Sequence, residues 1–237
     1  MIRFYAPEIS HNPVLPEEES KHCTKVVRHT AGDEIEVVDG KGALYKCIVK
    51  EPNPKATRVE IVETICKGNH WPCKIAVAIA PTKNPERMEW MVEKLTEMGV
   101  DRIILMKCAR SERKEMKPDR LEKKIVSAMK QSLKTVKPEL SCNIPFGEIV
   151  SGFDSFQKFI CYCDEALGKE YLGAALKPHC DTIVLIGPEG DFSPEEVEKA
   201  INHGFITVSL GESRLRTETA AIVATDIIHI VNNLAQK

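Results

Sequence analysis

The pattern of hydrophobic and polar residues changes near residue 70 of this 237-residue chain. Before that point, short runs of alternating apolar and polar positions are separated by turns, which is typical of half-buried strands. After it, near-continuous apolar runs alternate with segments of helical period, which is typical of a parallel sheet covered on both faces. The pattern therefore predicts a β-rich domain over 1–70 and a larger α/β domain over 73–237, joined by the polar segment CKGNHWPC (66–73).

The first domain carries the signals of a small barrel with one helix. The runs EIEVV (34–38) and ALYKCIVK (43–50) flank a turn with two glycines, which indicates a β-hairpin. RVEIVETI (58–65) is a further predicted strand. A short helix is predicted within PEEESKHCTKVVR (16–28), because a proline stands near its start.

Helix boundaries in the second domain follow from capping signals. Asn84 marks the start of one helix and Gly99 its end, and Ser193 and Glu196 have the spacing of a capping box. The last helix is predicted at roughly 218–234. Its expected buried stripe is Ala220, Val223, Ala224, Ile227, Val231 and Leu234. The predicted strands are IAVAIA (75–80), RIILM (102–106), KFICYC (158–163), TIVLIG (182–187) and ITVSL (206–210).

Charge is distributed unevenly, although the whole chain carries a formal net charge of only −2. Residues 102–137 hold twelve Lys or Arg against four Asp or Glu, a local excess of +8, whereas residues 181–237 carry −5. Such a basic stretch is either a solvated helix face or a surface that contacts phosphates. The small net charge excludes a protein that acts as a polycation along its whole length.

Cysteine usage and hydropathy exclude several classes of protein. Nine cysteines are scattered without a CxxC pair or a Cys/His cluster at zinc spacing, which supports neither a disulfide framework nor a metal site. Cys161 and Cys163 are expected to be small buried residues on one face of a strand. No apolar stretch approaches the ~20 residues of a membrane span. We therefore expect a soluble cytoplasmic protein that uses neither a metal nor a membrane.

Two polar loops follow predicted strands of the second domain, GPEGDF (187–192) and LGESRLRTET (210–219). In an open α/β sheet, ligands bind beyond the carboxyl ends of the strands, where such loops gather. Neither loop fits GxGxxG or GxxxxGK[ST], which argues against ordinary dinucleotide and P-loop sites. The first loop alone is also typical of a structural turn. The second loop brings more polar groups to a helix entrance than capping requires, which favours a functional site.

These loops and three other segments resemble one known family. LIGPEGDFSPEEVEKA (185–200) and SLGESRLRTETAAIVA (209–224) resemble the RsmE family of SPOUT-superfamily methyltransferases. APTKNPERMEWMVEKLTEMGV (80–100), RSER (110–113) and KHCTKVVRHTAGDEIEVVDGKG (21–42) are similar to further parts of that family. The resemblance spans nearly the whole chain. It implies methylation of uridine N3 in small-subunit (16S) ribosomal RNA, with S-adenosylmethionine as the methyl donor.

The same resemblance implies an architecture and partners. It implies a PUA-like RNA-binding β-barrel at 1–70 and a trefoil-knotted SPOUT methyltransferase domain at 73–237, acting as a homodimer on small-subunit ribosomal RNA or the assembled subunit. The chain departs from the family at Lys134, where Arg is frequent, and at Asp191, where many members have a second glycine. Lys134 weakens the expectation of one phosphate contact, because lysine cannot form the bidentate fork of arginine.

The resemblance also implies roles for individual residues. Arg216 is expected to stabilise the uracil anion and Glu218 or Glu189 to accept the N3 proton, although either glutamate is equally able to pair with an arginine. The cofactor is expected at Gly187, Pro188, Gly190, Leu210, Gly211, Leu215 and Thr217. Phosphate contacts are expected from Arg3, His22, Arg28, Lys83, Arg110, Arg113 and Lys134, and no metal is required.

Two other functions remain compatible with the sequence. Another SPOUT activity, such as ribose 2′-O-methylation, would use a similar cofactor pocket and would need no base anion. A non-catalytic RNA-binding assembly factor would keep the fold without turnover, but the presence of both Gly-containing loops argues against it.

Overall fold

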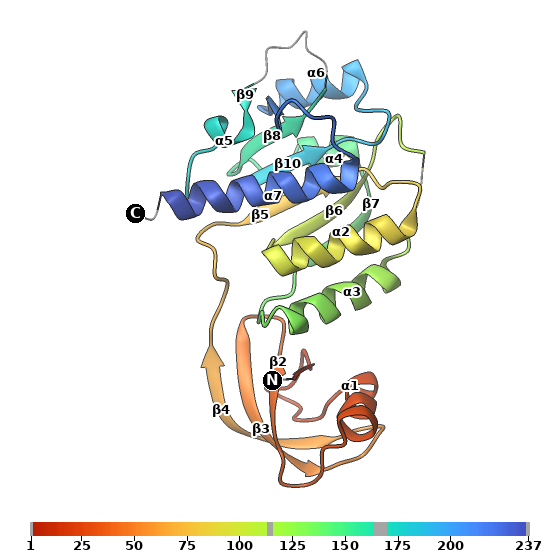
Figure 1. The fold of residues 1–237 in the computed structure, drawn as a ribbon, viewed down its shortest axis with the longest axis vertical. Coiled ribbons are helices and arrows are strands. Elements are labelled where there is room, and N and C mark those ends of the chain that lie inside the picture. Colours follow the sequence, from red (N-terminus) through yellow and green to blue (C-terminus); the bar gives the residue numbers. More distant parts are fainter. Residues whose placement is uncertain (1, 113–115, 164–169, 236–237) are drawn as a thin grey trace. The chain divides into compact units, whose positions relative to one another are not determined.

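The chain divides into two compact units (Figure 1). Unit 1 comprises residues 1–70 and 126–137, and unit 2 comprises residues 71–125 and 138–237. The structure is a computed structural model, and it describes residues 2–112, 116–163 and 170–235.

Unit 1 is built on a four-stranded sheet with the order β1-β2-β3-β4. Its strands are β1 (Arg3–Tyr5), β2 (Glu34–Val38), β3 (Ala43–Glu51) and β4 (Arg58–Cys66). The predicted hairpin is confirmed as β2 and β3, and β1, which the pattern did not predict, pairs with β2 in parallel. Residues 13–15 form hydrogen bonds with residues 57–59 at the other edge. The segment that starts in β1 therefore reaches both edges, which gives the sheet a partly closed form.

The helix predicted in unit 1 is irregular. α1 (Glu17–Lys21) continues directly as a π-helix, η1 (His22–Val27). The chain leaves η1 through Arg28 in a left-handed conformation (φ 66°, ψ 36°), and the N–H groups of Arg28 and His29 both donate to Cys23 O. Val27 and His29, on either side of this exit, line a pocket together with residues of β2 and β3. π-turns are rare and are frequently found at functional sites.

Residues 126–137 belong to unit 1 because of their packing. They include the second half of α3 (Pro118–Gln131), where Met129 is fully buried against Val38 and Leu44. Lys130 forms an ion pair with Glu19 of α1. Part of the basic stretch at 102–137 is therefore used to hold unit 1 together.

Unit 2 contains a seven-stranded sheet with the order β7-β6-β5-β10-β8-β11-β9, in which all strand pairs of the described chain are parallel. Its strands are β5 (Ile75–Ile79), β6 (Arg102–Lys107), β7 (Glu139–Pro145), β8 (Gln157–Cys161), β9 (Glu170–Tyr171), β10 (Thr182–Ile186) and β11 (Ile206–Ser209). The five predicted strands and their parallel arrangement are confirmed. The two edge strands were missed, because β7 is half-exposed and lacks a continuous apolar run, and β9 has only two residues.

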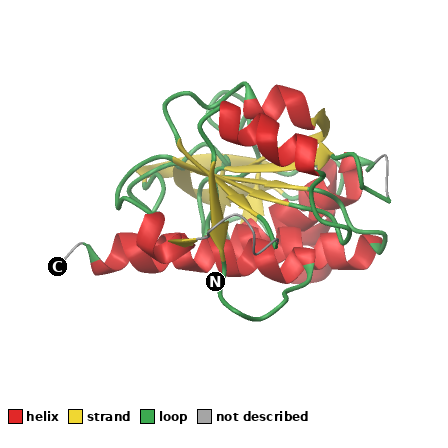
Figure 2. Ribbon diagram, turned by 90° about the horizontal axis from the view of Figure 1, so that it is seen from above, coloured by secondary structure: helices red, strands yellow, loops and turns green. Residues whose placement is uncertain are grey.

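Helices cover both faces of this sheet (Figure 2). They are α2 (Pro85–Met98), the start of α3, α4 (Phe146–Val150), α5 (Leu172–Ala175), α6 (Pro194–Asn202) and α7 (Thr217–Leu234). Alternate strand residues enter two separate cores. Ile75 and Val77 pack in the core that includes α2, α3, α5 and α7, whereas Ala76 and Ala78 pack in the core that includes α4 and α6.

The predicted helix boundaries are confirmed by capping geometry. The Asn84 side chain accepts a hydrogen bond from Glu86 N, and Ser193 and Glu196 form both bonds of a capping box. The predicted stripe of α7 is wrong at Leu234, which is 66% exposed. The buried residue of that last turn is Asn232, which accepts a hydrogen bond from His179 N and donates one to Cys73 Sγ.

Candidate active site

Three loops leave the carboxyl edge of the sheet in unit 2 close to one another. They follow β5 (80–84), β10 (187–193) and β11 (210–216). Because β5 and β10 are neighbours in a parallel sheet and β11 lies two strands from β10, the loops emerge on the same side. The two polar loops identified in the sequence therefore lie where an open α/β sheet binds its ligands.

A hydrogen bond joins the loop after β10 to the start of α7. Thr217 Oγ1 donates to Gly187 O at 3.1 Å, and Thr217 is buried. On the other side, Lys83 N in the loop after β5 donates to Glu189 Oε1 at 3.4 Å. The two predicted segments therefore meet at one place, and the loop after β5 contacts one of them, the loop after β10.

Close packing determines the shape of the loop after β10. A Cβ on Gly187 would lie 3.1 Å from the Phe192 ring and 3.2 Å from Asp191 Oδ1, so glycine fits this position best. Asp191 has a φ of 60°, a left-handed conformation that aspartate tolerates better than most residues. Its carboxylate accepts hydrogen bonds from Phe192 N at 2.8 Å and from Cys163 N at 3.0 Å. Asp191 therefore stands in for a glycine and also ties the end of β8 to this loop.

Arg216 lies at the N-terminus of α7, directly before the threonine that joins the loops. Its backbone is extended (φ −71°, ψ 155°), and its carbonyl accepts a hydrogen bond from Ala220 N at 2.8 Å. Its side chain is exposed and forms no hydrogen bond or ion pair with any residue that the structure describes. The guanidinium of Arg216 is therefore available to a ligand at this edge of the sheet.

The two candidate proton acceptors have different surroundings. The Glu218 side chain is only 7% exposed, and its carboxylate lies 3.6 Å from Arg87 Nε. Glu189 is exposed, and within the described residues its carboxylate receives one long hydrogen bond, from Lys83 N. Pairing with an arginine, which the sequence left open for both residues, is therefore found at Glu218, and the carboxylate of Glu189 stays accessible.

The remaining residues expected to hold the cofactor lie in the same two loops. Leu210 and Leu215 are half-buried against the core. Gly211 has a φ of 112°, which glycine adopts without strain. The backbone N–H groups of Gly190, Gly211 and Leu215 donate to no described residue. Pro188 is buried, and its carbonyl accepts from Asp191 N.

Two of the three basic residues expected to contact RNA in unit 2 lie beside these loops. The Lys83 side chain is 84% exposed, with its Nζ 3.5 Å from Glu112 Oε2. Arg110 donates from its guanidinium to Gly190 O at 3.1 Å. Arg113 lies outside the described residues. The loop after β10 therefore has a positively charged border on the side of β5 and β6.

The basic residues expected to contact RNA in unit 1 differ in exposure. Arg28 is exposed and its side chain has no partner among the residues described. His22 is half-buried, with its ring 5.7 Å from that of Phe4. Lys134, which was expected in the larger domain, is half-buried in the segment of unit 1 that follows α3. Arg28 is thus the one most open to a ligand.

Arg3 lies in a different environment from the one expected of a phosphate contact. It is 7% exposed, and its Nε lies 2.9 Å from Glu36 Oε2. Its guanidinium also donates to Leu133 O. A buried arginine with its charge compensated stabilises the packing of unit 1, so this placement favours a structural role for Arg3 over a phosphate contact.

Arg87 is part of the site and was not identified from the sequence. It is the third residue of α2 and contacts Glu218 of α7. A basic side chain in the first turn of a helix is unfavourable for the helix dipole. The unfavourable position of Arg87 in the first turn of a helix was visible in the sequence. The sequence does not show which carboxylate pairs with it.

Two thiols near the loops, those of Cys108 and Cys161, are unsuited to nucleophilic catalysis. Burial raises the pKa of Cys161 and of Cys108 far above the ordinary value, so neither forms a thiolate near neutral pH. The expectation that Cys161 and Cys163 are both buried is wrong, because β8 ends at Cys161 and Cys163 is exposed beyond it.

The described parts of the chain contain no cluster of three or more His, Cys, Asp or Glu able to hold a metal ion. None of the helices found there is long and apolar enough to cross a membrane.

Two domain families match the sequence. The RNA methyltransferase domain family matches residues 69–229, and the RNA methyltransferase PUA domain family matches residues 15–62. The first match contains all three loops at the carboxyl edge of the large sheet. The second contains most of the small sheet and the irregular helix of unit 1.

Known proteins resemble the chain over nearly its full length. The Ribosomal RNA small subunit methyltransferase E of Aquifex aeolicus is 30% identical over 237 residues, which is 95% of this chain and 97% of the relative. A probable rRNA-methyltransferase from Porphyromonas gingivalis has a crystal structure that matches at a TM-score of 0.94 and 42% identity, covering 99% of this chain and 100% of that one. The crystal structure of a Ribosomal RNA small subunit methyltransferase E from Neisseria gonorrhoeae bound to S-adenosyl methionine matches at a TM-score of 0.86 and 26% identity, over 98% of both chains.

Proposed function

Because this chain belongs to the RNA methyltransferase family, we propose that it methylates N3 of a uridine in small-subunit (16S) ribosomal RNA with S-adenosylmethionine. The observation that carries the proposal is the bond between Thr217 and Gly187, since it joins two loops at the carboxyl edge of the sheet. Arg216, whose guanidinium has no partner among the described residues, lies directly beside that junction in the chain.

The loop residues fit S-adenosylmethionine. The N–H groups of Gly190, Gly211 and Leu215, which bond to no described residue, are donors for polar groups of the ligand, and Leu210 and Leu215 offer apolar contacts to its adenine. Gly187, Pro188 and Thr217 shape the backbone around these groups. The bound cofactor supplies an electrophilic methyl group, and the protein has to align it with uracil N3.

Arg216 and a glutamate carry the chemistry of the base in this proposal. Removing the N3 proton leaves negative charge on the uracil ring, and a guanidinium beside the uracil oxygens stabilises that charge. Glu189 is the more accessible proton acceptor, and Glu218 is the alternative. The pair Arg87–Glu218 then positions the start of α7, on which Arg216 stands.

RNA binding is assigned to both units. Residues 1–70 form the PUA-like RNA-binding domain and residues 73–237 the methyltransferase domain in this proposal, with residues 126–137 of the second segment packing as part of unit 1. N3 lies on the Watson–Crick edge, so the target base has to be presented unpaired or flipped. Phosphate contacts are proposed for Lys83, Arg110 and Arg113 and for His22, Arg28 and Lys134; Arg3 is the least suited of the candidates because it is buried with Glu36.

The finer architecture is part of the same proposal. We infer a trefoil knot in unit 2, a homodimer and a cytoplasmic location. The knot is supported by the non-consecutive strand order around β10 and by the return of the chain at Thr217 to the loop after β10. The homodimer is supported by large apolar side chains that are exposed on the neighbouring helices α2 and α7, namely Trp90, Ile230 and Leu234.

Thr217→Val tests the junction of the loops. The substitution keeps the shape of the side chain and removes the hydrogen bond to Gly187 O, so this bond no longer holds the start of α7 to the loop after β10. We expect the affinity for S-adenosylmethionine, measured by calorimetry, to fall about tenfold, with about 1 kcal/mol lost in stability. Thr219→Val is the matched control, because Thr219 makes no side-chain hydrogen bond to a described residue. Equal affinities of the two variants would contradict a role of the junction in binding.

Mass spectrometry of digested RNA tests the function itself. The purified protein is incubated with S-adenosylmethionine and either small-subunit RNA or the assembled subunit, and the expected product is a uridine with the methyl group on the base. A methyl group on ribose would instead identify 2′-O-methylation. Absence of both cofactor binding and product would favour a non-catalytic assembly factor.

A further inference from the structure

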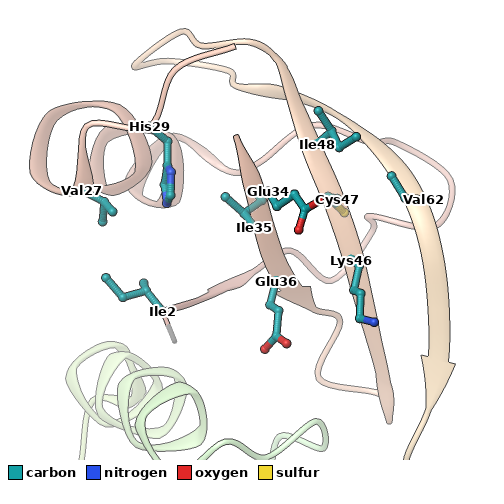
Figure 3. Close-up of a pocket in the computed structure, with 10 residues that line it drawn as sticks. All are labelled: Ile2, Val27, His29, Glu34, Ile35, Glu36, Lys46, Cys47, Ile48 and Val62. Atoms are coloured by element: carbon teal, nitrogen blue, oxygen red, sulfur yellow. The ribbon is translucent and has the colours of Figure 1, made fainter. Parts of the chain in front are cut away.

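A pocket of about 480 Å³ lies in unit 1 on the face of β2 and β3 (Figure 3). Its volume is in the range of about 300–1,000 Å³ that is usual for sites of small ligands. Two of its apolar side chains, Ile2 and Val62, are 50% and 62% exposed. The lining consists of Ile2, Val27, His29, Glu34, Ile35, Glu36, Lys46, Cys47, Ile48 and Val62. The pocket is therefore mostly apolar, with a few charged groups on the strands.

The charged groups on the strands are paired, with one exception. Glu36 bonds to Arg3 at 2.9 Å, and Lys46 bonds to Glu63 at 2.7 Å. The pKa of Lys46 is raised chiefly by Glu63 and, from further away, by Glu36 and Glu34. Glu34 is exposed and forms no hydrogen bond or ion pair with any described residue. The pocket therefore offers one carboxylate that is free to accept hydrogen bonds from a ligand.

The lining also includes an aromatic ring, and a cation stands next to that ring in the chain. The His29 ring is held by Asp33, whose Oδ2 lies 3.2 Å from Nδ1, and it packs edge-on against Phe4 at 6.1 Å. Arg28 stands between the lining residues Val27 and His29 at the left-handed exit of η1. Its side chain is exposed and unpaired among the described residues. An aromatic ring and a carboxylate thus line the same pocket, and an exposed arginine stands next to the ring in the chain.

Resting on the RNA-binding role proposed for unit 1, we propose that this pocket holds one unpaired nucleotide of the RNA. The base lies against His29 and the apolar wall, its N–H groups donate to Glu34, and its phosphate contacts Arg28. Proteins read unpaired RNA bases in this way, by stacking on aromatic side chains and by hydrogen bonds to the Watson–Crick edge. Guanine is the preferred base, because it presents a ring N–H and an amino group side by side to a carboxylate.

A basic protein segment is the weaker candidate for this pocket. Such a segment would be attracted by carboxylates, but Glu36 is already neutralised by Arg3. The segment that supplies Val27 and His29 to the lining also carries the exposed side chains of Lys25 and Arg28, which repel a positively charged chain and attract phosphates. The charged side chains that have no described partner therefore favour a nucleotide over a basic protein segment in this pocket.

Binding of short oligonucleotides tests the pocket without methyl transfer. The full-length protein is titrated, at one fixed salt concentration, with labelled U-rich heptamers that carry a central G, A or U, and fluorescence anisotropy gives the affinities. We expect the G-containing heptamer to bind about tenfold more tightly than the others, and Glu34→Gln to abolish that preference. Arg28→Gln is expected to weaken all three heptamers to a similar extent, because phosphate contacts carry no sequence information.

Glu51→Gln is the matched control, since Glu51 is an exposed carboxylate of β3 outside the pocket; it should keep the preference for guanine. Equal binding of the three heptamers by the unmodified protein would overturn the pocket and leave the methyltransferase proposal standing. A preference for guanine that depends on Glu34, in a protein that methylates no RNA, would support the pocket and contradict the methyltransferase proposal. Weaker binding of Glu34→Gln to the assembled subunit, with unchanged affinity for all heptamers, would show that a protein segment binds there and would overturn the proposal.

Discussion

Arg216→Ala is expected to lower the rate of methyl transfer to small-subunit RNA by about 10²–10³-fold, the loss typical when one group that stabilises a developing negative charge is removed. Affinity for S-adenosylmethionine should change little, because the groups proposed to hold the cofactor are backbone atoms of the loops and the Leu210 and Leu215 side chains. The measurement is single-turnover methylation with saturating cofactor, together with calorimetry for cofactor binding.

The structure explains why this arginine should matter more than its neighbours. Arg216 stands at the N-terminus of α7, next to the threonine that bonds to Gly187, and its guanidinium has no partner among the described residues. Arg214 is also exposed, but it lies two residues earlier in the loop.

Arg214→Ala is therefore the matched control, and it should retain most of the activity. Arg216→Lys should recover only part of the rate, because a point charge does not reproduce the planar fork of arginine. Unchanged rates in Arg216→Ala, with unchanged cofactor affinity, would remove this residue from the mechanism.

Gly99→Ala is expected to destabilise unit 2 by about 3 kcal/mol, through backbone strain and overpacking together. Gly99 ends α2 with a φ of 105°, and a Cβ there would lie 2.4 Å from the ring of Trp71. Displacing the ring would break the bond from Trp71 Nε1 to Asp101 Oδ2, which is 2.8 Å long, and its edge-on packing against His229. Urea unfolding followed by circular dichroism measures the loss.

Gly204→Ala separates backbone strain from packing. Gly204 has a similar φ of 84°, but a Cβ there meets nothing within 4 Å. This control should cost only about 1 kcal/mol, the strain of an alanine at positive φ. If both alanine variants lose the same stability, the close approach of Trp71 to Gly99 is not what makes the glycine necessary.

Local sequence patterns were sufficient for the elements that surround the site. Near-continuous apolar runs identified the five central strands, most of which are buried on both faces, and Asn84 and Ser193 identified two helix starts through their own side-chain bonds. The same reasoning failed at the sheet edges. β9 has two residues and β7 is half-exposed, so neither leaves a readable apolar pattern.

The composition of the candidate site was equally readable, because glycines and charged residues concentrated after two strands are unusual in a core. The resemblance then suggested roles for Arg216, Glu218 and Glu189. Their surroundings were not predictable. Glu218 is buried beside Arg87, which lies 131 positions earlier in the chain, and Glu189 stays exposed.

The sequence by itself determined the five central strands of unit 2, the hairpin of unit 1, the helix caps and the two polar loops, because each of these depends on residues that are close together in the chain. Only the tertiary structure decided that Thr217 bonds to Gly187, that Arg3 is buried with Glu36, and that residues 126–137 pack in unit 1. Each of those contacts joins residues that are far apart in the sequence. Many different tertiary arrangements are compatible with the same local sequence pattern, so the pattern does not determine which of these contacts form.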